Sequence, residues 1–462
     1  MADYTIIDLF AGCGGLGEGF TQAGFKIISE VEMDKWACES LRTRHLYHEL
    51  SSFRGGRRYY NRYLKGEVDK KYIYIRFPEI EDRISHTVIE AELNDQNVPD
   101  IIGKIGLSIN YHGDKKINII LGGPPCQPYS LIGRARDPER MQQDGRHFLY
   151  RYYLEILQMV QPDYFVYENV PGLFTARANG KKVFERLIDD FSGLYIPYVV
   201  TPPLIEVAKQ PSSYILKSSH FFVPQNRKRL ILIGYRKDLK NKYPDIDTVF
   251  KRLQNKAEKN KQTLDSGIKQ MLTVYDAISD LPRLFPGEGS NDWYCKYDVN
   301  NSLTSYQKKM RDKSPGVINH QARTHMLSDL KRYEYFIRHI NKYGHPANIE
   351  TLKKKNHELL PAHKHLDKFL DRFKVQQWDK PASTITAHIA KDGHYFIHPD
   401  EEQCRSFTVR EAARCQSFPD NYKFEGPRTE QFRQVGNAVP PLLARSIAGE
   451  LKVELDKIYG HK

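Results

Sequence analysis

The stretch YTIIDLFAGCGGLGEG, residues 4–19, joins a strand, a glycine turn and the start of a helix, and it sets the fold class. Its first part, residues 4–10, is a short apolar run bounded by glycine, which predicts a buried strand. Gly12, Gly14 and Gly17 follow at the spacing GxGxxG. Glycines at this spacing, between a strand and a helix, let the backbone approach a nucleotide closely.

A second strand is predicted over residues 26–31, and it ends at Glu32. An acid at this position accepts hydrogen bonds from ribose hydroxyls in nucleotide-binding βαβ units. Asp8 and Phe10, just before the glycine turn, add a carboxylate and an aromatic ring beside the ligand. The unit therefore predicts an α/β fold with a nucleotide-type cofactor, and its spacing does not separate a dinucleotide from an adenosine-type cofactor.

A cysteine lies within GGPPCQPYS, residues 122–130, directly after the apolar run at residues 117–121. Pro124 and Pro125 fix the backbone that enters Cys126, so the direction of its thiol is set in advance. Two glycines, two prolines and a polar glutamine surround one thiol, which favours a nucleophile over a structural cysteine. We expect this nucleophile at the end of a buried strand.

Two further strands bring an acid and two cations to the same region. Residues 164–167 predict a strand that delivers Glu168 at its carboxyl end. Carboxyl ends of parallel strands share one edge of a sheet, so Glu168 is expected to face Cys126. Arg227 and Arg229 alternate before an apolar strand and are expected to project to one face, where they can hold a carboxylate, a phosphate or a base oxygen.

Composition narrows the class of protein. The chain has 462 residues and a formal net charge of +13, which predicts two or three domains and an anionic partner, with nucleic acid ahead of a membrane surface. No apolar run approaches the ~18 residues that a membrane span needs, and the first residues do not resemble a signal peptide. Six cysteines without CxxC pairs indicate neither zinc nor disulfides. A protein of the cytoplasm without a metal is expected.

The remaining segments suggest an insertion, a loop and a separate lobe. Residues 42–84 are basic and tyrosine-rich, typical of a solvated surface insertion, with contact to phosphates or bases as the alternative. The polar run at residues 133–146 has a glycine at each end and predicts a loop that closes over a substrate. Residues 286–405 lose the alternation of strands and helices, which indicates a separate lobe. Residues 435–441 are predicted as a turn before a final helix at residues 442–452.

Six blocks occur in order along the chain: DLFAGCGG, GGPPCQPYS, ENV, QNRKR, REAARCQSFP and GNAVPP. This set resembles the motifs of DNA cytosine-5 methyltransferases. The resemblance implies an S-adenosylmethionine-dependent methyltransferase (Rossmann-like) α/β fold, with a mostly parallel sheet and a smaller inserted target-recognition domain. The expected division is a catalytic and cofactor-binding domain at residues 1–285, a target-recognition domain at 286–405 and a C-terminal segment at 406–462 that returns to the catalytic domain.

The resemblance also assigns roles by position. It implies that Cys126 is the nucleophile, that Glu168 engages cytosine N3, and that Arg227 and Arg229 line the cytosine pocket. The positions expected to contact S-adenosylmethionine are Asp8, Phe10, Gly12, Gly14, Leu16, Glu32, Met33, Glu92, Pro125, Leu149, Asn437 and Val439. Two of these depart from the family pattern: Met33 stands where an aromatic residue is common, and Glu92 replaces the usual aspartate after the third strand.

These assignments predict an enzyme that methylates C5 of a flipped-out cytosine in a specific duplex DNA sequence, through a covalent Cys126 adduct at C6. The family context suggests the modification enzyme of a restriction-modification system and leaves open a cognate restriction endonuclease acting on the same site. Two alternatives remain at this point: a cytosine-5 methyltransferase for tRNA, and a catalytically idle module that only binds DNA. The intact Cys126 and Glu168 argue against the second, because binding alone needs neither.

Overall fold

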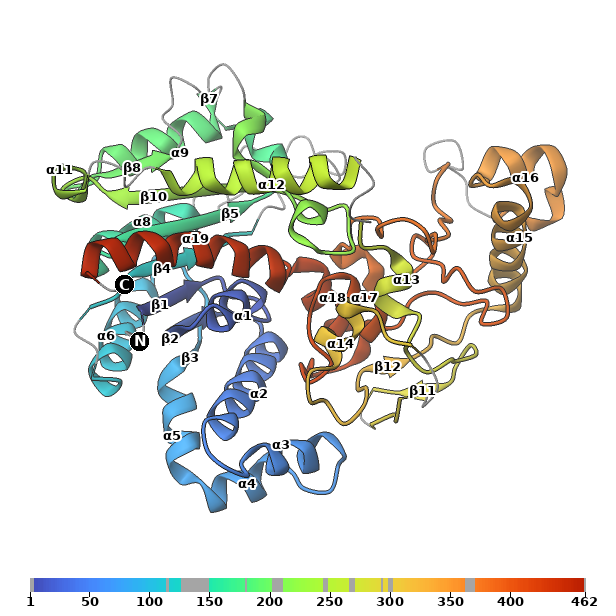
Figure 1. The fold of residues 1–462 in the computed structure, drawn as a ribbon, viewed down its shortest axis with the longest axis horizontal. Helices are drawn as coiled ribbons and strands as arrows, with labels where there is room; N and C mark the ends of the chain where they lie inside the picture. The colour runs from blue at the N-terminus through green and yellow to red at the C-terminus, as the bar shows by residue number, and fades with distance from the viewer. Residues whose placement is uncertain are drawn as a thin grey trace.

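Eight of the strands that the structure describes form one large sheet (Figure 1). The computed structural model describes residues 4–113, 116–125, 149–178, 181–201, 211–243, 248–265, 271–291, 294–297, 302–361 and 370–460. Within these residues the sheet has eight strands in the order β3-β2-β1-β4-β5-β10-β8, and β9 pairs with β10. Their bounds are β1 Tyr4–Leu9, β2 Phe25–Glu32, β3 Val88–Glu90, β4 Ile119–Gly122, β5 Tyr164–Asn169, β8 Tyr198–Thr201, β9 Ile215–Lys217 and β10 Lys228–Arg236.

The direction of the strands brings their functional ends to one edge. Strands β1 to β5 of this sheet run parallel, whereas β10 runs antiparallel to β5. The carboxyl ends of β1, β4 and β5 therefore meet, with Leu9 paired to Gly122 and Gly122 paired to Tyr167. Because β10 is reversed, its amino end lies at the same edge, where Ile231 pairs with Glu168. The predicted mostly parallel α/β sheet is thus confirmed.

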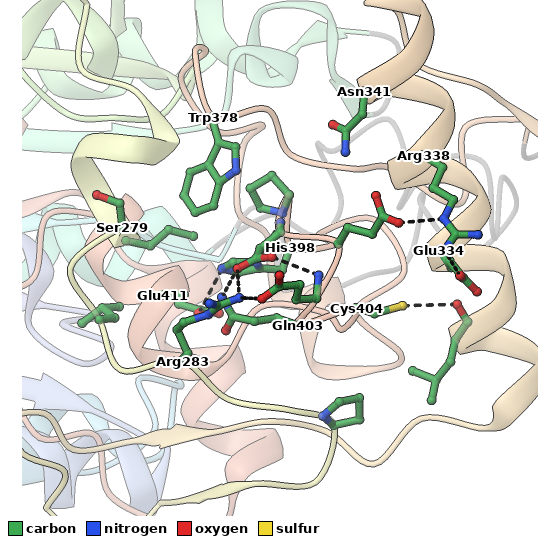
Figure 2. A pocket seen from close by; sticks show the side chains of 18 of the residues that line it. Ser279, Arg283, Glu334, Arg338, Asn341, Trp378, His398, Gln403, Cys404 and Glu411 are labelled. Carbon is green, nitrogen blue, oxygen red and sulfur yellow. Dashed lines mark hydrogen bonds and ion pairs between the residues drawn. The ribbon is translucent and has the colours of Figure 1, made fainter. Parts of the chain in front are cut away.

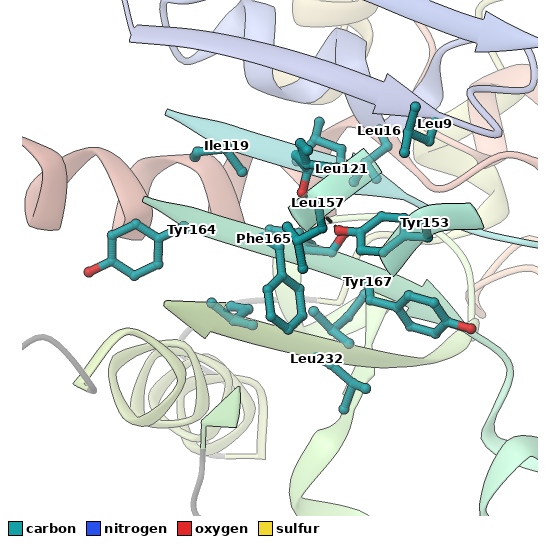
Figure 3. Close-up of a cluster of buried hydrophobic side chains, with 14 of the residues drawn as sticks. Leu9, Leu16, Ile119, Leu121, Tyr153, Leu157, Tyr164, Phe165, Tyr167 and Leu232 are labelled. Carbon is teal, nitrogen blue, oxygen red and sulfur yellow. Dashed lines mark hydrogen bonds between the residues drawn. The ribbon is translucent and has the colours of Figure 1, made fainter. Parts of the chain in front are cut away.

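The centre of the sheet is a buried cluster of aliphatic and aromatic side chains (Figure 3). Tyr153 places its ring in this cluster, and its hydroxyl donates to the Ile120 carbonyl at 3.1 Å, so the one polar atom of the side chain is satisfied. Phe165 stacks on Phe191 with ring centroids 4.3 Å apart. A cluster of this kind removes a large apolar area from water and fixes the sheet edge that carries the site.

Helices cover the sheet on its two faces, and the final helix α19 lies beside the first helix α1 (Figure 1). Gly19 permits this contact, because a Cβ there would lie 2.4 Å from the Ala444 Cβ. Arg252 of α12 donates to Glu450 of α19 at 2.8 Å. The helices of this body are α1 Gly15–Gln22, α6 Val98–Tyr111, α8 Leu149–Val160, α9 Val183–Ser192, α11 Leu239–Lys242, α12 Val249–Asp265 and α19 Pro441–Tyr459. Its short elements are η3 Pro171–Thr175, β6 Arg177–Ala178, β7 Lys181–Lys182, η4 Pro211–Tyr214 and η5 Ser218–Phe221.

Residues 42–84 fold into helices that project from the sheet body in Figure 1. The helices are α2 Lys35–Ser51, α3 Arg57–Leu64, α4 Lys70–Arg76 and α5 Pro78–Thr87. Leu46, Tyr60, Ile73 and Ile84 are among the side chains of a separate small core between them. The expectation of a merely solvated insertion was therefore incomplete, because one side of each helix is buried.

A second lobe lies beside the sheet body on the right of Figure 1. Its main core combines residues from 274–281, 306–317, 382–396 and 407–442. Its elements are α13 Val274–Ile278, β11 Gly289–Ser290, α14 Ser305–Arg311, β12 His320–Gln321, α15 Leu327–Tyr343, α16 Ile349–Lys355, η7 His357–Leu359, η9 Ala387–Ala390, α17 Val409–Cys415 and α18 Arg428–Asn437. The prediction of a turn over residues 435–441 was partly wrong, because residues 435–437 end helix α18. Among the described helices, none combines the length and apolar character needed to cross a membrane.

Candidate functional site

An acid and an arginine meet at the carboxyl edge of the sheet. Glu168 lies near the end of β5, and Arg229 lies at the beginning of the reversed strand β10. The Arg229 Nε atom is 2.7 Å from Glu168 Oε1, and each side chain is 12% exposed. The arginine compensates the charge of a largely buried carboxylate and fixes its direction.

The loop that leads to Cys126 passes directly beside this pair. Gly123 lies against the carboxylate, because a Cβ at this position would be 2.9 Å from Glu168 Oε2. Asn169, the next residue of β5, donates its side-chain N–H to the Pro124 carbonyl at 3.2 Å. Cys126 itself lies outside the described residues, as does the predicted closing loop at residues 133–146. The described part of this loop, up to residue 125, therefore passes beside Glu168 through Gly123 and is held by Asn169 at Pro124.

Arg227 and Arg229 do not share one environment, although the sequence predicted that both project to one face. The Arg227 side chain is fully buried and donates to the carbonyls of Ile385, Gly436 and Asn437. These carbonyls all belong to the second lobe, two of them at the end of α18, so Arg227 joins the sheet body to that lobe. Only Arg229 of the two reaches Glu168 in the described residues.

The glycine turn after β1 adopts the conformation that its sequence requires. Phe10, Gly12 and Gly14 have φ angles of 57°, 56° and 79°, in the left-handed region that glycine tolerates and phenylalanine rarely adopts. A Cβ on Gly12 would meet no atom within 4 Å, so the space beside this backbone is open. A strained aromatic residue before an open glycine turn is a feature of binding sites.

Glu32, the last residue of β2, is hydrogen-bonded to the glycine turn. Its Oε2 accepts from the Gly12 N–H at 2.8 Å, and its Oε1 accepts from the N–H groups of Met33 and Asp34 at 2.9 and 2.8 Å. Burial raises the pKa of Glu32, and these three donors act in the opposite direction. A carboxylate has about four acceptor positions, so one remains for a ligand hydroxyl.

The other predicted cofactor positions differ in how they face the solvent. Met33, Glu92 and Asn437 are exposed, whereas Leu16 and Val439 are buried. Pro125 and Leu149 are half-buried at the two ends of the undescribed segment.

Asp8 lies against α1. It is 1% exposed, and the nearby backbone is that of Gly17. Burial and the neighbouring Glu30 carboxylate raise the pKa of Asp8 well above its ordinary value. Side chains alternate between the two faces of a strand, and this alternation turns Asp8 toward α1.

A set of buried ion pairs under the turn was also not predicted. Glu18 of α1 pairs with Arg44 of α2 at 2.6 Å, and Glu30 of β2 lies 2.7 Å from His45. Burial alone would raise the pKa of Glu18, but Arg44 and His48 hold it well below its ordinary value. These partners are far apart in the sequence, and no local pattern identifies them. They fasten α2 against the unit that carries the glycine turn.

A separate cavity of about 1230 Å³ lies in the second lobe (Figure 2). Trp378 and His398 line it together with charged residues from α15 and the segment before α17. Most of this charge is already paired, as in the contact between Arg338 and Glu401 at 2.7 Å. Glu168 and Arg229 are not among its lining residues, so this cavity is distinct from the site at the sheet edge.

Comparison with known proteins identifies one family. The family model described as C-5 cytosine-specific DNA methylase matches residues 4–58 and 91–453. The type II methyltransferase M.Bpa9945I of Bacillus paralicheniformis is 40% identical over 473 residues, which cover 99% of this chain and 99% of the relative. The type II methyltransferase M.XorII of Xanthomonas oryzae pv. oryzae is 30% identical over 464 residues, which cover 98% of this chain and 85% of the relative.

One solved structure supports the fold independently. The crystal structure of a prophage-encoded E. coli protein, described as a DNA modification methyltransferase, aligns with a TM-score of 0.61 and 21% identity. The alignment covers 98% of this chain and 100% of that protein. At this identity the match bears on the fold alone.

Proposed function

The chain belongs to the C-5 cytosine-specific DNA methylase family, and we propose that it methylates C5 of a flipped-out cytosine through Cys126, Glu168 and Arg229. The family and the relatives make it a DNA cytosine-5 methyltransferase of the kind found in type II restriction-modification systems. The observation that carries the proposed mechanism is the Glu168–Arg229 pair beside Gly123, three residues before Cys126.

The methyl donor of the proposal is S-adenosylmethionine, which supplies an electrophilic methyl group on a sulfonium when bound. The residues at the glycine turn fit such a ligand. Gly12 borders open space, and Glu32 keeps one acceptor position for a ribose hydroxyl. Phe10 and Met33 would flank the adenosine, and Asn437 is exposed at the last residue of α18.

Cys126 activates the base in the proposed mechanism. Cytosine C5 is a poor nucleophile, so the Cys126 thiolate adds to C6 and forms an S–C6 bond. The electron pair of the C5–C6 double bond then becomes available at C5, where the new methyl group is accepted. Loss of the C5 proton restores the double bond and expels the Cys126 thiolate. The proton passes to water and the methyl donor would leave as a neutral thioether, so the enzyme is regenerated.

Glu168 would hold the base during these steps. Thiolate addition builds negative charge on the cytosine ring, and a proton shared between Glu168 and N3 offsets that charge. Arg229 keeps the carboxylate in place from the neighbouring strand. Gly123 gives the carboxylate the room it occupies, since any side chain at this position would displace it. The acid is therefore positioned before the base arrives, which reduces the cost of ordering it.

None of these contacts can form with a base stacked inside a duplex. The cytosine must leave the helix at a cost of a few kcal/mol, which contacts between the protein and the DNA backbone have to offset. The net charge of +13 supports such contacts. Residues 133–146 remain the candidate for closure over the flipped base. A cognate restriction endonuclease acting on the same site remains a further expectation of the proposal.

The covalent step can be tested with a base that cannot complete the reaction. Fluorine at C5 cannot leave as a proton does, so DNA whose cytosines carry it should accumulate the protein adduct in the presence of S-adenosylmethionine. Mass spectrometry should find this adduct on the peptide that contains Cys126. No adduct should form with Cys126→Ala. An adduct on another residue, or none with the wild-type protein, would contradict the proposed mechanism.

A further inference from the structure

The helices α3 and α4 carry a dense positive charge that the methylation site does not use. Residues 53–77 contain eight Lys and Arg against two acids, a balance of +6 within a chain whose net charge is +13. The family model does not match residues 59–90, so most of this segment lies outside the pattern shared by the family. The family pattern therefore does not account for this segment.

Some cations of this region are neutralised by neighbouring acids. Lys70 lies 3.0 Å from Glu39, and Arg83 lies 2.6 Å from Glu49. Arg42, at the root of the projection, lies 3.0 Å from Glu90. These pairs join α2 to α4, to α5 and to the end of β3, so these cations are compensated on the side that faces α2 and the sheet.

The outward cations are different. Arg54, Arg57, Arg58 and Lys71, here called the cationic face, make no ion pair or hydrogen bond through their side chains with any part of the chain that the structure describes. Arg57 is half-buried and the other three side chains are exposed. Three of the four fall within five residues of sequence, so like charges repel one another at short range. Without a bound anion, this clustering of like charges does not stabilise the protein.

Aromatic rings order the cations beside this face. The Arg62 guanidinium lies 5.4 Å from the Tyr72 ring centroid, and Arg76 donates to the Tyr59 hydroxyl at 2.8 Å. Each contact joins α3 to α4, so the two helices form one platform. Arg57 and Arg58 lie in the first turn of α3 and Lys71 in the first turn of α4, while Arg54 lies three residues before α3. The members of the cationic face therefore belong to this pair of helices and to the segment that enters it.

We propose that the cationic face binds the phosphates of duplex DNA that extends beyond the target cytosine. The inference rests on the proposed function, since it takes DNA as the substrate. A duplex carries about one negative charge per 1.7 Å, and release of its counterions rewards each cation that reaches a phosphate. The guanidinium group of an arginine can donate two parallel hydrogen bonds to one phosphate. This contact adds affinity without reading sequence, because phosphates carry no base information.

The test measures how DNA binding depends on salt. In the variant Arg54→Gln, Arg57→Gln, Arg58→Gln, Lys71→Gln, the loss of four phosphate contacts should reduce the magnitude of the slope of log K against log salt by about 3.6. The probe is a duplex of about 60 base pairs, on the order of 200 Å long, compared with one of about 15 base pairs. The reduction is expected on the long duplex and not on the short one.

A matched control removes the same charge elsewhere. Lys237, Lys242, Lys251 and Lys256 are exposed on α11, on α12 and in the turn before α11, and their replacement by Gln lowers the net charge by the same amount. The control should keep the wild-type slope on both duplexes. An unchanged slope in the cationic-face variant, an equal fall on the two duplexes, or an equal fall in the control would each overturn the proposal.

Failure of this inference and failure of the proposed function give different results. With saturating short duplex, the cationic-face variant should transfer methyl groups at the wild-type rate, because the proposal gives the cationic face no contact with that duplex. If the wild-type protein methylates DNA and the slope is unchanged, only the cationic face is refuted. If the wild-type protein methylates no DNA, the proposed function fails whatever the slopes are.

Discussion

Replacement of Gly123 by alanine should disable catalysis while leaving the fold intact. The new Cβ would lie 2.9 Å from Glu168 Oε2, below the distance that two such atoms tolerate, whereas the next contacts are at 3.7 and 3.8 Å. The atom that must move is the end of a side chain, so the carboxylate shifts and the backbone does not. A displacement approaching 1 Å at a catalytic group costs on the order of 100-fold in rate, which equals about 2.7 kcal/mol of transition-state stabilisation.

The assay compares kcat for methyl transfer with the affinity for S-adenosylmethionine and with the thermal midpoint. Gly123→Ala should lower kcat about 100-fold, with cofactor affinity and thermal midpoint close to wild type. Gly103→Ala is the matched control, because a Cβ in α6 at that position meets no atom within 4 Å. It should keep full activity and gain about 0.5–1 kcal/mol of stability as a helix-interior glycine replaced by alanine. Wild-type kcat in Gly123→Ala would refute the assigned position of Glu168.

Two further predictions concern buried polar groups. Arg227→Met leaves the carbonyls of Ile385, Gly436 and Asn437 without their donor and should lower the free energy of unfolding by about 3–5 kcal/mol in urea denaturation. Arg433→Met, which loses one exposed pair with Glu430, should change it by less than about 0.5 kcal/mol, and equal losses would contradict the joining role of Arg227. His320 accepts from Thr408 and donates to the Pro282 carbonyl, and burial lowers its pKa to about 4. Between these two pKa values the unfolded chain binds a proton that the folded chain does not, so stability should fall by about 3 kcal/mol as pH drops from about 6.5 to 4. The variant His320→Asn should flatten this pH dependence of the free energy of unfolding. An unchanged profile in the variant would contradict the assignment to His320.

The catalytic edge was predictable because its signals are local. A strand, a glycine turn and an acid at the end of the next strand follow one another within residues 4–32. The parallel direction of β4 and β5 then follows from the alternation of strands and helices, and it places Glu168 beside the loop that enters Cys126. The roles of Cys126 and of the cofactor residues stay predictions.

The division of labour between Arg227 and Arg229 could not be predicted from alternation. Strand periodicity gives both side chains one direction, but the contacts of Arg227 depend on segments more than 150 residues away. Ile385 and Gly436 approach Arg227 only in the folded chain. The local pattern therefore identified both arginines but could not show that Arg227 hydrogen-bonds to the second lobe at Ile385 and at the end of α18.

Helix α18 and the core of the insertion were missed for a related reason. Helix α18 is mostly polar and buries Phe432 and Val435 against other segments, so no broad apolar stripe marks it in the sequence. In the insertion, tyrosines such as Tyr60 supply buried surface while the neighbouring arginines make the stretch read as solvated. Because a tyrosine has both an apolar ring and a polar hydroxyl, its presence in a basic segment does not show from the sequence whether it is buried.

Transfer of labelled methyl from S-adenosylmethionine to unmethylated genomic DNA tests the central claim most directly. The wild-type protein should label the DNA, and bisulfite sequencing should find the protected cytosines within one short motif. Cys126→Ala should still bind DNA and transfer no label. Labelling by Cys126→Ala would contradict the mechanism, and labelling of tRNA without DNA by the wild-type protein would contradict the proposed substrate.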